Sequence, residues 1–136
     1  MQKPETVSTA ELVKALDSLK KASQLYRKSI DEKADIEIQR AFRDACIQRF
    51  EYCIEFSWKV SIKILGSDVK AAKPAIREMA RNNLIQDPEK WLGFIDSRND
   101  TSHAYDEDVA LKVYKQIESF LPEVVCLVET LEKQKQ

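Results

Sequence analysis

The stretch "IEIQRAFRDACIQRFEYCIEFSWKVSIKIL", residues 36–65, decides the fold because it predicts one long helix with apolar side chains on two faces. Gly66 follows it as a C-terminal capping residue. The apolar positions cover more than half of the helix circumference: Ile38, Phe42, Ala45, Ile47, Phe50, Cys53, Ile54, Trp58, Val60, Ile64 and Leu65. Because such a helix needs a partner on each side, we assign one face to the core and the other to a subunit interface.

An amphipathic helix is predicted before this stretch, over residues 8–30. Ser8 and Glu11 have the spacing of a capping box. A single apolar stripe follows at helical spacing: Leu12, Leu16, Leu19, Tyr26 and Ile30. The polar residues 31–35 then form a connector between the two helices.

Shorter helices are predicted after residue 66. Pro74 suits the first turn of a helix that runs to about Asn83. Asp87 and Pro88 form an N-cap and first-position pair for the next helix, which carries Trp91, Leu92 and Ile95.

A last long helix is predicted after Asp106 or Asp108, either of which can cap it. Pro122 should kink or divide this helix near residues 119–121. Its apolar stripe comprises Val109, Val113, Ile117, Phe120, Val124, Val128 and Leu131. The sum is an all-α protein with one domain over residues 1–136, an antiparallel up-and-down bundle of about four main helices plus one short helix.

Composition narrows the function classes. Two glycines and four prolines in 136 residues are typical of a helical chain, and a net charge of −1 argues against a general polyanion binder. One histidine and three scattered cysteines (Cys46, Cys53 and Cys126) exclude a structural zinc site, so we expect no metal or cofactor and packed, reduced thiols. Without a long apolar run or a secretory signal, we expect a cytoplasmic protein with no membrane partner.

Charge is nevertheless unevenly distributed along the chain. Residues 59–81 carry six Lys/Arg against two acids, net +4, whereas residues 96–108 carry five acids against Arg98, net −4. This polarity either guides an RNA or another charged partner, or reflects two solvated helix faces.

The octet "RNDTSHAY", residues 98–105, contains the only histidine, His103. On a helical wheel Arg98 continues the inward stripe of Trp91 and Ile95, and an inward arginine needs a partner or a wet cleft. On an ideal helix His103 would lie about 140° from Arg98. The two can therefore meet only if the helix ends near His103 and the imidazole turns back, or if a second subunit completes the pair.

Arginine and histidine together can cleave RNA without a metal. Imidazole can accept the proton of a ribose 2′-OH or protonate the leaving 5′ oxygen, while guanidinium stabilises the phosphate. Asn99 and Asp100 could orient those groups, and Tyr105 offers a hydroxyl for modification. The spacing alone is equally typical of a helix end.

The octet resembles the Arg-x4-His-x-Tyr motif of the HEPN superfamily. Residues 47–60 resemble the Phe-Glu-x3-Glu-x2-Trp-Lys pattern of the nucleotidyltransferase substrate-binding protein family, and residues 75–110 resemble its second block. The first pattern falls here on Phe50, Glu51, Glu55, Trp58 and Lys59.

This resemblance implies a helical homodimer whose Arg/His pairs face a shared cleft. It also implies a partner, a minimal nucleotidyltransferase encoded nearby. Related toxin–antitoxin pairs join an RNase toxin to a nucleotidyltransferase that silences it by adenylylation, so Arg98 and His103 would be catalytic and Tyr105 the modification site. The alternatives are a non-catalytic substrate- or nucleotide-binding subunit of a two-component nucleotidyltransferase, and a purely structural dimer.

The same resemblance makes Glu51, Glu55, Trp58 and Lys59 candidates for binding a nucleotide or RNA, with no DNA partner expected. Physical reasoning leaves a second interpretation for each. Glu55 and Lys59 are spaced for a surface ion pair, and Trp58 suits packing as well as base stacking. Without a Gly-rich phosphate loop or paired carboxylates after a strand, the chain should not itself be the nucleotidyltransferase.

Overall fold

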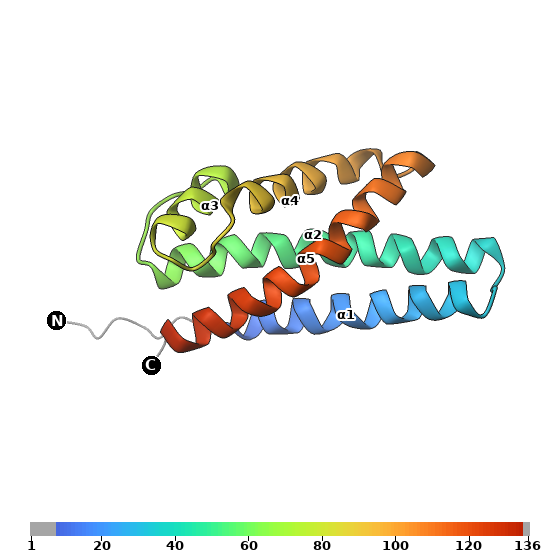
Figure 1. The fold of residues 1–136 in the computed structure, drawn as a ribbon, viewed down its shortest axis with the longest axis horizontal. Helices are drawn as coiled ribbons and strands as arrows, with labels where there is room; N and C mark the ends of the chain where they lie inside the picture. Colours follow the sequence, from blue (N-terminus) through green and yellow to red (C-terminus); the bar gives the residue numbers. More distant parts are fainter. Residues whose placement is uncertain (1–7, 135–136) are drawn as a thin grey trace.

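The computed structural model describes residues 8–134 and confirms the all-α fold, with no strand in that range. A short 3-10 turn, η1, separates the last two of its five α-helices. The elements are α1 (Ala10–Asp31), α2 (Ile36–Ile64), α3 (Ala72–Arg81), α4 (Pro88–Asp100), η1 (Thr101–His103) and α5 (Glu107–Gln134). Figure 1 shows α1 and α2 as a long antiparallel hairpin, with α4 along α2 and α5 crossing the bundle diagonally.

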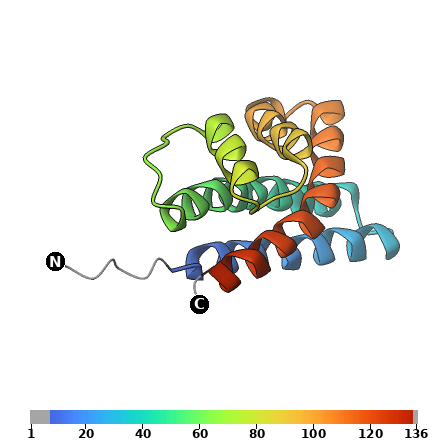
Figure 2. The same cartoon turned by 60° about the vertical axis from the view of Figure 1, so that its left-hand side comes forward.

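The central helix is α2, which contacts every other α-helix. In Figure 2, α1 lies on one side of α2, and α3 and α4 lie on the other. Most apolar side chains of α2 are therefore covered within one chain, although Ile38 remains 49% exposed. Since α3, α4 and α5 supply partners for the second face, two apolar faces do not by themselves require a second subunit, and the assignment to a subunit interface stays a prediction.

Aromatic rings hold α2, α4 and α5 together at the centre of the core. Phe120 of α5 makes edge-to-face contacts with Phe50, Trp91 and Phe94, with ring centroids 5.2, 5.6 and 5.3 Å away. None of these four side chains is exposed to solvent. Each buried aromatic of this size stabilises the fold by about 1.5–3 kcal/mol, so this cluster fixes the position of α4.

The local signals at most helix ends are confirmed. Gly66 has φ +66°, and the N–H groups of Gly66 and Ser67 donate to the carbonyls of Lys63 and Ile62 at 3.0 and 3.1 Å. This is a Schellman ending, for which glycine is suited because it adopts positive φ without strain. Asp87 caps α4 by accepting from the Lys90 N–H at 3.1 Å.

The start of α1 differs from the predicted capping box. Thr9, not Ser8, is the N-cap of α1, so the capping box with Glu11 is not formed. The Ser8 hydroxyl instead accepts from the Ala10 N–H at 3.0 Å, and the Thr9 hydroxyl donates to Glu132 of α5. The Thr9 hydroxyl is thus used in a tertiary contact, and Thr9 forms no side-chain cap hydrogen bond.

Pro122 does not divide α5, which is one helix from Glu107 to Gln134. A proline within a helix removes one N–H donor, here the partner of the Glu118 carbonyl. Both Pro122 and Glu118 are exposed, so water can take that bond.

The cysteines also differ from the expectation. Cys46 and Cys53 are buried as expected, and burial raises their pKa values to about 11 and about 12. Cys126 is exposed rather than packed. The expected uniform packing of the three thiols is therefore wrong for Cys126.

Candidate functional site

The octet of residues 98–105 lies where α4 ends and the chain turns into α5. The α-helix stops at Asp100, and η1 continues it for one tighter turn to His103. The Thr101 hydroxyl donates to the Arg98 carbonyl at 2.7 Å, which competes with the regular helical pattern. The prediction that the helix ends near His103 is therefore confirmed.

Asp106 then starts α5, which resolves the alternative between Asp106 and Asp108. Its carboxylate accepts from the N–H groups of Asp108 and Val109 at 2.9 and 3.3 Å. An acidic cap at this position also interacts favourably with the helix dipole.

Arg98 finds a carboxylate partner on α2. Its Nε lies 2.9 Å from Oε1 of Glu55, and the other oxygen of Glu55 lies 3.5 Å from Nζ of Lys59. The Nε–H group of Arg98 is not aligned for a directed hydrogen bond to Glu55. The Arg98 side chain, 37% exposed, therefore approaches Glu55 most closely through Nε, while Nη1 and Nη2 donate no hydrogen bond in the described part of the chain.

The octet does not bring Arg98 and His103 together within one chain. No polar contact joins the two side chains in the described part of the protein. His103 is exposed and lines a hollow of about 690 Å³ between α4 and α5, together with Asp100, Lys112 and Lys115. Arg98 instead faces Glu55 on α2. The break in the helix does not by itself unite the pair, and a contribution from another subunit stays a prediction.

The side chain of Tyr105 is 87% exposed. It lines a second hollow, of about 600 Å³, with Asp44, Gln48 and Glu51 of α2. Its ring centroid lies 6.2 Å from that of His103 in an edge-to-face arrangement. The phenol is thus open to a second molecule.

The other candidate residues divide between packing and exposure. Trp58 is 7% exposed, which favours its packing role, and the Lys59 ammonium lies 5.6 Å from the centre of its ring. Glu51 belongs to the hollow beside Tyr105, whereas Glu55 joins Arg98 and Lys59. The exposed side chains of Asn99 and Asp100 form no hydrogen bond or ion pair within residues 8–134.

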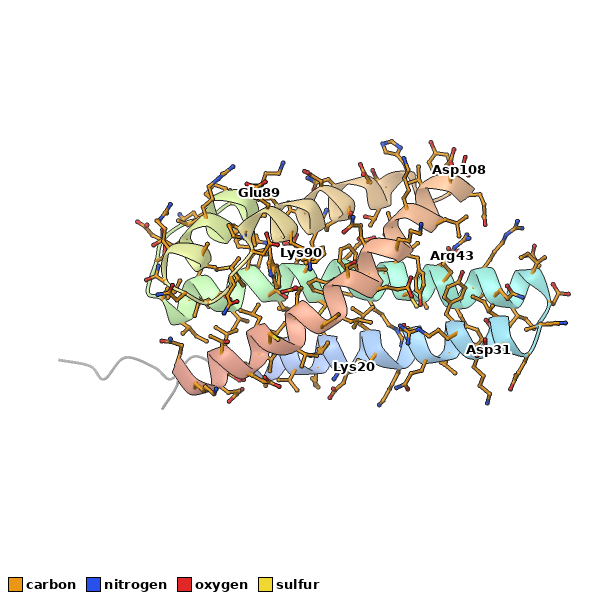
Figure 3. All side chains as sticks on the ribbon, viewed as in Figure 1. Lys20, Asp31, Arg43, Glu89, Lys90 and Asp108 are labelled. Carbon is orange, nitrogen blue, oxygen red and sulfur yellow. The ribbon has the colours of Figure 1, made fainter. Side chains whose placement is uncertain are left out.

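Sequence reasoning missed one feature next to the octet, an ion pair between the buried Arg43 and the exposed Glu107. Nη1 and Nη2 of Arg43 donate to the two Glu107 oxygens at 2.6 and 3.2 Å, and Arg40 approaches the same carboxylate at 3.7 Å. The hydrogen bond from Arg43 holds the pKa of Glu107 below its usual range. Figure 3 shows Arg43 on the part of α2 near the first turns of α5. Its spacing with Ile47 and Phe50 on the apolar stripe was the signal that could have revealed it.

Comparison with known proteins identifies the family of this chain. Residues 9–133 match the family model for nucleotidyltransferase substrate binding protein-like proteins. The chain belongs to this family. A Haemophilus influenzae protein named "Probable ribonuclease HepT" is 36% identical over 107 residues, covering 73% of each chain.

Two solved structures also resemble this family member. One, from Haemophilus influenzae, is described as revealing the fold of a substrate-binding domain of a nucleotidyltransferase; it has a TM-score of 0.82 and 32% identity and covers 92% of this chain and 99% of its own. The other, from Thermus thermophilus, has a TM-score of 0.74 and 28% identity, with coverages of 88% and 98%. Within residues 8–134, no helix is apolar enough over a sufficient length to cross a bilayer, and no group of His, Cys, Asp and Glu is arranged to hold a metal ion.

Proposed function

We propose that this protein is a metal-independent endoribonuclease of the HEPN type, which acts as the toxin partner of a minimal nucleotidyltransferase in the cytoplasm. The observation that carries the proposal is the state of Arg98, which approaches Glu55 most closely through Nε and donates no hydrogen bond from Nη1 or Nη2 within residues 8–134. A guanidinium in this state can donate hydrogen bonds to a phosphate while it keeps its contact with Glu55. The relative named as a probable ribonuclease supports the same reading.

The proposed reaction uses the RNA itself as nucleophile. The imidazole of His103 accepts the proton of a ribose 2′-OH, whose oxygen attacks the adjacent phosphorus while the bond to the 5′ oxygen breaks. A protonated imidazole supplies the proton that the departing 5′ oxygen needs. The products are a 2′,3′-cyclic phosphate and a 5′-hydroxyl, and Arg98 stabilises the charge that develops on the phosphoryl oxygens.

The reaction requires a homodimer, because Arg98 and His103 face different sides of α4 in one chain. We propose that each composite site takes Arg98 from one protomer and His103 from the other. One imidazole is enough for each site, because the proton that it accepts from the 2′-OH can be passed to the departing 5′ oxygen.

A mixing experiment tests both the activity and the composite site. Arg98→Ala and His103→Ala proteins should each be inactive on a single-stranded RNA. If they are unfolded, mixed and refolded together, half of the dimers carry one intact site of two, so activity should return to about a quarter of wild type. Cleavage by His103→Ala alone would refute the catalytic role. Failure of the mixture, with heterodimers demonstrated by mass spectrometry, would refute the shared site.

Tyr105 is the proposed target of the nucleotidyltransferase, because its exposed phenol lies beside the cleavage residues. Incubation with the partner and ATP should add AMP units to wild-type protein and abolish cleavage. Tyr105→Phe should stay unmodified and active, with Tyr52→Phe as a control since Tyr52 is also exposed. Modification of Tyr105→Phe at the wild-type level would exclude this site.

A second candidate function is a substrate- or nucleotide-binding subunit that performs no chemistry. The structural neighbour described as the fold of a substrate-binding domain of a nucleotidyltransferase favours it. In that case, a nucleotide would bind stoichiometrically, RNA would remain intact, and His103→Ala would leave the transfer reaction of the partner unchanged.

A further inference from the structure

A third hollow lies away from the octet, at the end of the molecule where α1 begins and α2 ends, on the left in Figure 1. Its volume is about 790 Å³, within the range of sites that enclose small ligands. The last turns of α2 form one wall, and residues 67–70, which lead toward α3, form another. The side chains relevant to its chemistry are Phe56, Trp58, Lys59, Lys63, Val69 and Lys70.

The charges of this hollow favour an anion. Three lysines line it, Lys59, Lys63 and Lys70, together with two acids, Glu11 and Asp68. Lys63 and Lys70 have no carboxylate within 4.0 Å in the described part of the chain, whereas Lys59 is paired with Glu55. Two unpaired ammonium groups in one concave surface attract a charged ligand more strongly than the same groups on a convex face.

Two other basic residues of the stretch 59–81 are paired with carboxylates. Lys73 pairs with Asp96 at 2.7 Å, and Arg81 pairs with Glu78 at 2.5 Å. The excess positive charge of that stretch is therefore not spread evenly over solvated helix faces. Part of it converges on the hollow through Lys63 and Lys70.

The rest of the lining is apolar and partly aromatic. Phe56 and Val69 are half-buried, and Trp58 is 7% exposed. The indole N–H of Trp58 has no hydrogen-bond acceptor within residues 8–134. A small inorganic anion would satisfy the lysines and leave the apolar wall uncovered. The lining suits a ligand that joins a phosphate to a flat ring, as a nucleotide does.

We propose that this hollow is a nucleotide-binding site, separate from the octet, in which Lys63 and Lys70 bind the phosphate and Phe56 and Val69 contact the base. The proposal does not depend on RNA cleavage by Arg98 and His103. One residue connects the two regions, because Lys59 lines the hollow and also contacts the carboxylate that holds Arg98.

Isothermal titration with AMP, adenosine and inorganic phosphate tests the site on the full chain. AMP should bind at least tenfold more tightly than either fragment, because only AMP contacts both the lysines and the apolar wall. Lys63→Ala/Lys70→Ala should weaken AMP binding at least tenfold. Lys14→Ala/Lys20→Ala, which removes two exposed lysines of α1 and the same charge, should not; Lys20 is labelled in Figure 3.

Several results would overturn the proposal. They are no binding of AMP, equal binding by the Lys63→Ala/Lys70→Ala and wild-type proteins, or equal binding of phosphate and AMP. Val69→Glu, which places a carboxylate on the wall without disturbing a helix, should also abolish binding. Arg98→Ala and His103→Ala should bind AMP as wild type does, so loss of cleavage and loss of nucleotide binding are distinguishable.

Discussion

Arg43 and Arg98 each pair with a glutamate between α2 and another helix, and the two pairs use the guanidinium differently. Arg43, with a side chain 7% exposed, gives two nitrogens to the two oxygens of Glu107 at 2.6 and 3.2 Å. The Arg98 side chain, 37% exposed, approaches Glu55 most closely through Nε. In the first pair both carboxylate oxygens accept a hydrogen bond from the guanidinium, so it can fasten α5 to α2. In the second pair Nη1 and Nη2 donate no hydrogen bond within residues 8–134, so they can bind a ligand while Nε keeps its contact with Glu55.

The difference should be sharpest in Arg98→Ala, for which we expect the largest effect on activity. Loss of a group that stabilises developing charge should lower the rate of RNA cleavage by about 100- to 1000-fold. Stability should change little, because a partly exposed ion pair contributes at most about 1 kcal/mol. Single-turnover cleavage and thermal unfolding, measured on the same preparation, check both expectations. A large loss of stability would make Arg98 a structural residue like Arg43.

Arg43→Ala should give the reverse pattern. Removing a buried, doubly hydrogen-bonded guanidinium should lower the free energy of unfolding by about 1.5–3 kcal/mol. The cleavage rate per folded molecule should stay within a few-fold of wild type. Urea unfolding measures the loss, and Arg40→Ala is the matched control, because Arg40 approaches the same carboxylate at 3.7 Å but is more exposed. If Arg43→Ala and Arg40→Ala lowered the free energy of unfolding equally, the doubly hydrogen-bonded Arg43–Glu107 pair would have no special role.

These pairs also explain what the sequence could and could not reveal. The helices over residues 10–31, 36–64 and 107–134 were predictable because apolar periodicity and caps are local properties. Both ion pairs join residues far apart in the chain, 64 positions for Arg43 and Glu107. No spacing rule predicts such a partner. The sequence could predict only that an arginine on an apolar stripe must have one, as it did for Arg98.

What the sequence left open has the same origin. Residues 36–65 do show two apolar faces, but sequence alone could not distinguish a second subunit from α3, α4 and α5 folding back onto α2. Similarly, Ser8 and Thr9 are both good caps, and the sequence does not reveal that the Thr9 hydroxyl donates to the distant Glu132. The direction of His103 depends on the 3-10 turn after Asp100, which is shorter than any periodic signal.

Acidic pH should distinguish the pairs by stability. Arg43 lowers the pKa of Glu107, so the folded protein binds the proton less readily than the unfolded chain. The stabilisation is therefore complete above the ordinary carboxyl pKa, near 4.5, and is lost as pH falls through the lower folded value. Urea unfolding of wild type and Glu107→Gln should differ at pH 7, and the difference should shrink as pH falls below 4.5. A gap that stays constant would mean that the Glu107 charge does not contribute.

The smallest effect is expected from Glu55→Gln, which tests whether the single contact at Nε positions Arg98. The amide keeps the shape of the side chain but loses the charge that attracts both Arg98 and Lys59. The free energy of unfolding should change by less than about 1 kcal/mol, as for other partly exposed ion pairs. Cleavage should fall by only about 3- to 10-fold, because Arg98 remains present but is less often oriented toward the phosphate.

Lys59→Ala is the control for this variant, since it removes the other cation from Glu55 and leaves the Arg98 contact intact. Its cleavage rate should match wild type if orientation of Arg98 is what Glu55 provides. A faster Glu55→Gln enzyme would reverse the interpretation: the carboxylate would then compete with the phosphate for Arg98, and the open pair would restrain the site rather than support it.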